Sequence, residues 1–366
     1  MRNFLTIAIC LMVVMAKSQD PHYTLINTQP LVLNPALTGV FDFDYKHKDI
    51  RFASLYRQQW STVASNYAST AKPFHTTSLS IDGLLKRDKE IHGDYVGAGI
   101  SLMHDKAGDL NLTTQQVNFS TSCNKSLNSS KTRFLTLGLQ GGFAYRSVNE
   151  NNAFYDNQWT GTFFNPDLPS GESFPSSSYS FSDFSIGAVY EKFEDLKPKY
   201  MIGIAYFHIN TPTQALYENS SANLGQKLNI HGQIDYPIGL NKSIVSHLVF
   251  STQKGETKTN FGGYYKTKFY KKKQMKNSYY FGGGGRITGN HEKFTQPDAV
   301  FIAYKMSMGD FLWGVAYDIN ISKLNRASQS FGAFEISLMY YRDLYKKSRK
   351  QKKHRSKYKA KCPDDQ

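Results

Sequence analysis

The chain has 366 residues, of which 40% are hydrophobic, 14% are aromatic and only 20% are charged. Beyond residue 18 no apolar run approaches the ~18–20 residues of a transmembrane helix, which excludes a polytopic helical membrane protein. Three cysteines are too few for a disulfide-stapled miniprotein, and the aromatic content excludes disorder over most of the chain. What remains is a large β-rich chain, either soluble or a membrane barrel.

The amino terminus has the layout of a secretory signal peptide. A short basic stretch, Met1–Asn3, precedes an apolar run over Phe4–Met15. Ala16-Lys17-Ser18 then places small residues where a signal peptidase cleaves. We therefore expect residues 1–18 to be removed after export.

The net charge of +15 is concentrated at the carboxyl end. Residues 346–361 contain ten Lys or Arg and no acid, so the tail, residues 346–366, carries +8 once Asp364 and Asp365 are counted. Residues 19–345 carry only +5. A strongly basic chain suggests nucleic-acid binding as a function, but a signal peptide directs the chain out of the compartment that holds nucleic acid. We therefore expect no nucleic-acid partner.

Several segments alternate strictly between two kinds of side chain. In Arg133–Arg146 the odd positions from 135 onward are Leu, Leu, Leu, Gly, Phe and Tyr, whereas the even positions from 136 onward are Thr, Gly, Gln, Gly, Ala and Arg. The same period of two runs through Phe311–Ser322, Val300–Met306 and Ile202–Tyr206. A period of two predicts strands with one apolar face and one small or polar face.

Two architectures produce this pattern. A soluble β-sandwich hides the apolar face in a shared core, whereas a transmembrane barrel turns that face to lipid and carries aromatic girdles at both interfaces. Here the apolar runs are bordered by aromatic residues, and the opposite face is rich in Gly, Ser, Thr, Asn and Gln rather than Lys and Glu. These features, together with the export signal, favour an all-β, transmembrane antiparallel β-barrel.

The alternation predicts about 14 strands, an even number as bacterial single-chain barrels require. The expected strands are 48–60, 73–84, 94–104, 110–126, 132–147, 180–191, 199–210, 226–237, 243–252, 257–269, 277–288, 297–307, 311–322 and 331–343. The alternation is weakest in 226–237 and 257–269. We expect an outer-membrane barrel domain over 19–345, with 19–47 as an N-terminal periplasmic or plug segment. We expect residues 346–366 to form a basic, disordered periplasmic tail.

The chain carries no motif that predicts catalysis, a cofactor or a metal. Gly282–Gly285 lacks the Lys-Ser/Thr of a phosphate loop, and the histidines have no metal-ligand spacing. No Gly-x-Ser-x-Gly element marks a serine hydrolase. Cys123 and Cys362 are expected to be two free thiols. We therefore predict no catalytic, cofactor-binding or metal-binding residue, although barrel enzymes with catalytic loops exist.

Three motifs, taken in chain order, resemble those of a known protein family. They are Asn34–Gly39 (NPALTG), Tyr56–Trp60 (YRQQW) and Asp105–Asp109 (DKAGD). With the later segments around Asp183, Gly203, Tyr317 and Phe334, this set resembles the PorP/SprF family of outer-membrane proteins of the type IX secretion system.

The resemblance implies an outer-membrane β-barrel without enzymatic activity in a Gram-negative cell. It also implies a role in type IX export, gliding motility or surface attachment of a large adhesin-like cargo protein that carries a C-terminal sorting domain. The partners implied are outer-membrane lipid, such cargo, and periplasmic components of the secretion machinery. A general porin or small-molecule transporter is the alternative function.

Nine residues in three places are candidate partner contacts: Asn34, Pro35, Asp105, Lys106, Asp109, Lys346, Lys347, Arg349 and Lys350. The Asn-Pro pair predicts either a plug or docking element or an ordinary turn. The Asp-rich motif predicts a partner contact at the barrel rim or simply a charged hairpin tip. The basic run predicts binding to an acidic partner or to anionic headgroups, or a solvated tail.

The predicted strand order also assigns sides. Five strands precede the long connection at 149–179, and fourteen precede the tail. If both termini face the periplasm, the long loop lies outside the cell and residues 346–366 lie in the periplasm.

Overall fold

The computed structural model describes residues 20–61, 72–87, 94–108, 111–149, 155–165, 167–169, 171, 177–194, 196–214, 223–271, 274–290, 295–323 and 325–344. The predicted signal peptide, Asp109, Cys362 and the basic tail with its four candidate contacts lie outside the described residues. No helix among the described residues is long and apolar enough to cross a membrane.

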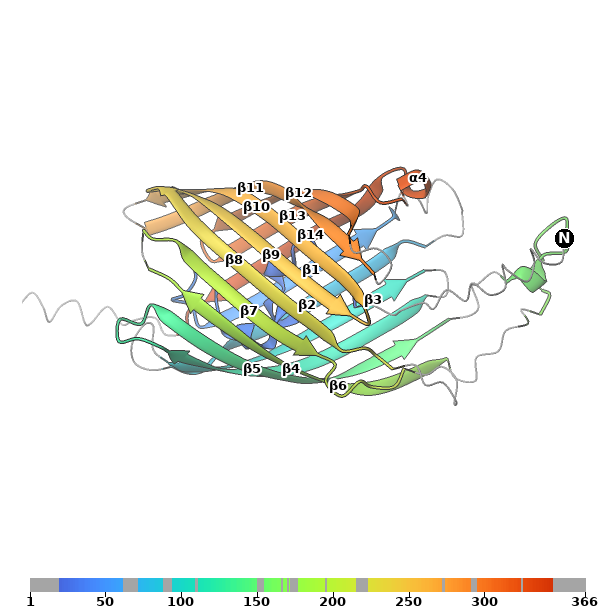
Figure 1. Ribbon diagram of the computed structural model, residues 1–366, viewed down its shortest axis with the longest axis horizontal. Helices are drawn as coiled ribbons and strands as arrows, with labels where there is room; N and C mark the ends of the chain where they lie inside the picture. Colours follow the sequence, from blue (N-terminus) through green and yellow to red (C-terminus); the bar gives the residue numbers. More distant parts are fainter. Residues whose placement is uncertain are drawn as a thin grey trace, which may run out of the picture.

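The described chain forms one closed barrel of fourteen antiparallel strands, in which each strand pairs with the next and β14 pairs with β1 (Figure 1). The strands are β1 (Ile50–Gln59), β2 (Phe74–Arg87), β3 (Tyr95–Ala107), β4 (Leu112–Ser126), β5 (Arg133–Ser147), β6 (Ser178–Lys192), β7 (Lys199–Phe207), β8 (Lys227–Gly239), β9 (Lys242–Gln253), β10 (Glu256–Lys271), β11 (Gln274–Gly289), β12 (Gln296–Met308), β13 (Phe311–Asn320) and β14 (Phe331–Arg342). Closure excludes the sandwich, because a barrel has no second sheet.

Each predicted strand is confirmed, including the two in which the alternation is weak. The largest differences at a strand end are three residues, in β2, β3, β7 and β11. Of these, β7 stops at Phe207 rather than at residue 210. His208 has φ 57° and Thr211 has φ 41°, so the backbone leaves the extended conformation there and turns.

The two faces of the wall follow the predicted alternation. On β5, Leu137, Leu139 and Phe143 point outward with 57%, 60% and 67% of their surface exposed. Thr136 and Ala144 point inward and are buried. The apolar face is therefore the outer surface of the barrel, as a membrane wall requires.

Strand direction defines two ends of the barrel. The end where β1 starts and β14 stops is called the tail end, and it includes Leu344. The opposite end, where β5 stops and β6 starts, is called the loop end, and the long connection between these strands leaves from it (Figure 1). The long connection and the last described residue thus lie at opposite ends of the barrel.

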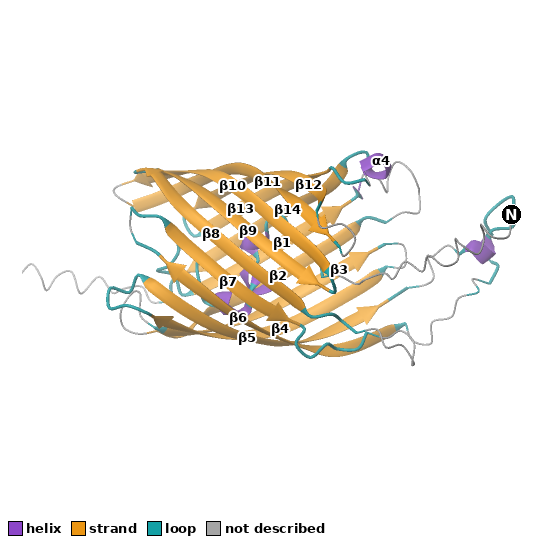
Figure 2. Cartoon of the chain, viewed as in Figure 1, coloured by secondary structure: helices purple, strands orange, loops and turns teal. Residues whose placement is uncertain are grey.

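Residues 20–49, named here the lumen segment, lie inside the barrel. They form three short helices, η1 (Ile26–Thr28), α2 (Pro30–Leu33) and η2 (Pro35–Leu37), visible within the wall in Figure 2. The buried apolar clusters join this segment to inward-facing wall residues, such as Leu33, Ala36 and Leu37 with Val189 and Val249. The apolar core is therefore formed between the segment and the wall.

The outward register leads to a test with two matched variants on β5. Leu139→Arg, near the middle of the strand, should lower the free energy of unfolding by ~2–4 kcal/mol, whereas Leu135→Arg, near the tail end of the same face, should cost about 0–1 kcal/mol. Urea unfolding followed by heat-modifiable gel mobility measures both. Equal costs for the two variants would contradict a membrane around this face.

Candidate functional site

The candidate site is the lumen, which the lumen segment crosses from end to end. The Asp20 carboxylate lies 3.0 Å from the Nε2 atom of His208 and 3.0 Å from the Nζ atom of Lys227. His208 follows β7 and Lys227 begins β8, so Asp20 lies at the loop end. The sequence-based expectation was that the amino terminus lies on the same side as the tail. The structure differs because the segment runs back through the lumen before β1 begins.

His208 secures this start with a second carboxylate. Its Nδ1 atom lies 2.9 Å from the Asp183 carboxylate, so the ring is placed between two acids. Burial alone would lower the pKa of His208, but Asp20 and Asp183 outweigh burial and raise the pKa to about 9. The imidazolium is therefore charged at neutral pH and ties the segment to the wall.

A cluster of four charged wall residues holds the next part of the segment. Glu335 accepts hydrogen bonds from the backbone N–H groups of Thr24 and Leu25, both at 2.7 Å. Arg57 forms ion pairs with Glu335 and, at 3.1 Å, with Asp318. Arg286 donates to Asp318 at 3.1 Å. All four wall side chains are buried, so their mutual neutralisation is what makes this cluster stable.

Asn34 anchors the middle of the segment. Its Oδ1 atom accepts from the Ala36 N–H at 2.9 Å and so caps η2, in which Pro35 takes the first position. Its Nδ2 atom donates to the carbonyls of Ala188 and Ile204, at 3.2 and 3.1 Å. The Asn-Pro pair is thus a local turn and a lumen anchor at once.

The wall approaches this turn closely because two facing residues have no side chain. A Cβ atom on Gly187 would collide with the Asn34 side chain, and one on Gly138 would collide with the Ala36 backbone. Only glycine fits at such an approach. Gly138 and Gly187 are also paired with each other across β5 and β6, so they form one seat.

Arg51 and Asp82 hold the segment closer to the tail end. Arg51 donates to the carbonyls of Val40 and Leu37 at 2.7 and 2.9 Å and forms a two-bond ion pair with Asp82 at 2.9 and 2.8 Å. Asp82 also accepts from the N–H of Gly39 at 2.7 Å. The pair is buried, and its hydrogen bonds supply the polar partners that this turn needs.

The last part of the segment is fixed by charge and by stacking. Asp44 pairs with Lys266 and Lys268, both at 2.7 Å. Lys46 pairs with Glu191 at 2.5 Å. Tyr45 stacks on Tyr341, with the ring centroids 3.9 Å apart. The segment is therefore anchored at both ends and in the middle.

The structure separates the nine candidate contacts. Asn34 and Pro35 are enclosed in the lumen, whereas Asp105 and Lys106 lie on β3 near the loop end. Asp105 accepts a hydrogen bond from Thr76 at 2.6 Å, and Lys106 is exposed. Asp109 and the four basic tail residues lie outside the described residues. Contact of any of these nine with a partner remains a prediction.

The sequence analysis missed the wall charges as a functional set. Arg51, Arg57, Asp82, Asp318 and Glu335 all point inward from strands whose inner face is otherwise small or polar. That position was the available signal, because a buried charge on the inner face of a barrel needs a partner across the lumen. Among the described residues no group of three or more His, Cys, Asp or Glu could hold a metal ion.

The charge cluster at Arg57 allows a test of how tightly the segment is held. Arg57→Met leaves Glu335 buried without its cation and should lower the free energy of unfolding by about 3–5 kcal/mol. Phe52→Met, on the outward face of the same strand, is the matched control and should be nearly neutral. Urea unfolding in micelles measures both variants. Equal stability of the two would show that the segment does not depend on this cluster.

Solved structures match the chain at low sequence identity. A FadL homologue from Pseudomonas aeruginosa has a TM-score of 0.44 at 9% identity, covering 84% of this chain and 92% of its own. The toluene transporter TbuX from Ralstonia pickettii has a TM-score of 0.42 at 11% identity, covering 86% of this chain and 93% of its own. The translocator domain of the autotransporter NalP from Neisseria meningitidis has a TM-score of 0.39 at 9% identity, covering 86% of this chain and 94% of its own.

No curated protein matches the chain in sequence. The family model described as "Type IX secretion system membrane protein PorP/SprF" matches residues 15–340. This range contains all fourteen strands except the last two residues of β14, and the whole lumen segment. The chain belongs to the PorP/SprF family of type IX secretion system membrane proteins.

Proposed function

We propose that the chain is a non-enzymatic component of the type IX secretion system in the outer membrane of a Gram-negative cell. It supports export or surface attachment of large, adhesin-like cargo that carries a C-terminal sorting domain, and it contacts periplasmic secretion or gliding components. The observation that carries this proposal is the lumen segment, because a barrel whose interior is occupied offers its two mouths and rims, rather than a pore, for function.

The alternative is a general porin or small-molecule transporter. A diffusion channel needs a polar interior open to water, as in porins. Here the middle of the lumen contains buried residues of the segment, including Asn34 and Ala36, which have no exposed surface. The residues around them form three apolar clusters with the wall. This packing supports partner binding over diffusion.

The cellular test compares two functions in one strain. Deleting the chain should abolish surface display of cargo with a C-terminal sorting domain, while uptake of small hydrophilic dyes should stay unchanged. Re-expression of the full chain is the control. Lost dye uptake with intact cargo display, or a large steady current from the pure protein in planar bilayers, would favour the porin instead.

The two ends of the barrel are assigned to two sides of the membrane in this proposal. The loop end faces the cell exterior and meets cargo, and the tail end faces the periplasm, where residues 346–366 meet secretion components or anionic headgroups. This assignment follows the general orientation of such barrels, with short turns inside and long loops outside. Ten cations in the tail make the attraction sensitive to salt.

Protease protection tests this assignment. Proteinase K added to intact cells should cleave between residues 149 and 179 and spare an epitope placed after Gln366. Permeabilised cells, in which the epitope becomes accessible, are the control. Cleavage of the epitope in intact cells, with the loop protected, would reverse the orientation.

A further inference from the structure

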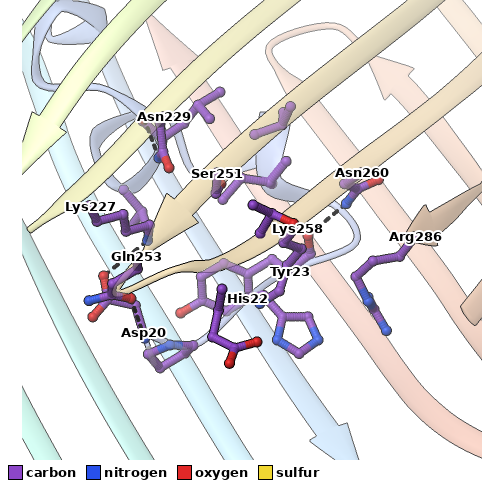
Figure 3. A pocket seen from close by; sticks show the side chains of 17 residues that line it. Asp20, His22, Tyr23, Lys227, Asn229, Ser251, Gln253, Lys258, Asn260 and Arg286 are labelled. Atoms are coloured by element: carbon purple, nitrogen blue, oxygen red, sulfur yellow. Dashed lines mark hydrogen bonds and ion pairs between the residues drawn. The ribbon is translucent and has the colours of Figure 1, made fainter. Parts of the chain in front are cut away.

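A small cavity lies at the loop end, beside the first residues of the lumen segment (Figure 3). Its volume is about 70 Å³, enough for one small polar group. Three cationic side chains from three strands line it, Lys227 on β8, Lys258 on β10 and Arg286 on β11. The segment contributes Asp20 and His22 on the other side.

The cationic side chains differ in whether they have partners. Lys227 pairs with Asp20 at 3.0 Å, and Arg286 pairs with Asp298 at 2.5 Å and Asp318 at 3.1 Å. Lys258 forms no ion pair or hydrogen bond with any residue in the described part of the chain. A largely enclosed ammonium among other cations is unfavourable unless an anion joins it.

Other acids on the cavity wall do not supply that anion. Asp20 is already committed to Lys227 and His208. Glu256, two residues before Lys258 on β10, has an interaction of its own. Among the described residues, Lys258 is therefore the basic side chain of this wall that has no ion pair or hydrogen bond.

His22 lies in the positive field of these cations, and its Nε2 atom is 3.4 Å from the Arg57 guanidinium. Burial lowers the pKa of His22, and the charges of Lys258, Arg286, Arg57 and Lys227 lower it further, well below its ordinary value. The ring is thus a neutral imidazole at neutral pH. Its N–H group can donate a hydrogen bond to an anion without needing to gain a proton.

A ligand larger than the cavity has room beside it. A second cavity of about 310 Å³ shares Asp20, Pro21 and His22 with the first and reaches the loop-end residues Ala107 and Leu112. Its wall combines Arg57, Arg146 and Asp105 with other polar and with apolar residues, so a chain that places one end in the small cavity can lie in the larger one.

We propose that the small cavity binds one oxyanionic group, a carboxylate or a phosphate, on a ligand that enters from the loop end. Lys258 is the main charge partner of that group, and Arg286 and His22 add hydrogen bonds. A carboxylate is already bound by basic side chains beside this cavity, since Asp20 pairs with Lys227 and His208. This inference goes beyond the proposed function and does not depend on it.

Thermal stabilisation by anions tests the site in the full chain, folded in detergent micelles. Inorganic phosphate, titrated against sodium chloride at constant ionic strength, should raise the temperature at which the compact gel band is lost, because a ligand that binds the folded state stabilises it. Lys258→Gln should reduce the apparent affinity for phosphate about ten-fold or more, as loss of one charge-assisted hydrogen bond implies. Lys242→Gln, an exposed lysine at the tail end, should leave the response unchanged.

A second arm separates the two oxyanions. N-acetylglycine carries a carboxylate, and N-acetylglycinamide is its neutral match. Stabilisation by phosphate, by N-acetylglycine or by both, absent with the amide and lost in Lys258→Gln, supports the site and identifies the preferred group.

The unliganded stability of Lys258→Gln is the folding control. Removing an unpaired cation from among cations should leave the barrel at least as stable as the native chain in sodium chloride alone. A strong loss of stability in this variant would make Lys258 a structural residue and overturn the proposal. So would equal responses of the native chain and Lys258→Gln, or no response to either oxyanion.

Discussion

A backbone that crosses a barrel lumen outside any sheet needs a wall partner for each polar group that its own turns leave free, because unpaired buried groups are costly. Glu335 meets this need at the start of the crossing, where its two oxygens accept from Thr24 and Leu25. At the far side, Arg51 donates to the carbonyls of Leu37 and Val40. The lumen segment has no strand pairing of its own, so hydrogen bonds with charged side chains of the wall hold its backbone in place.

The same constraint explains the inner face of the wall. Each inward charge that binds the segment has a counter-charge nearby, such as Asp82 for Arg51 and Asp235 for Lys266. Where the segment approaches most closely, the wall has glycine instead, as at Gly138 and Gly187. Charge pairs thus anchor the segment to the inner surface, and glycines make room for it where the backbones approach most closely.

The wall was predictable from the sequence, whereas the individual contacts inside the lumen were not. Strand positions and faces follow from a period of two, which each strand displays locally, as in Arg133–Arg146. The pairing of Arg57 with Asp318 joins residues 261 positions apart, and no local pattern encodes such a distance. Gln140 illustrates the limit: it reads as an ordinary lumen residue, yet its amide donates to the Leu31 carbonyl at 3.3 Å.

Closing the barrel and filling it depend on the same residues. Arg57 on β1 and Glu335 on β14 are direct partners in the pair of strands that closes the wall, and they are also the charges that hold Thr24 and Leu25. Near the tail end the same seam pairs Arg51 with Tyr341. Arg51 binds the segment backbone, and the Tyr341 ring stacks on Tyr45. The segment therefore contacts both strands of the seam at two levels, so it stabilises closure, and closure in turn completes its binding site. Removing the segment would leave the inward charges of this seam, Arg57 and Glu335, and the Tyr341 ring without the groups that they contact inside the lumen.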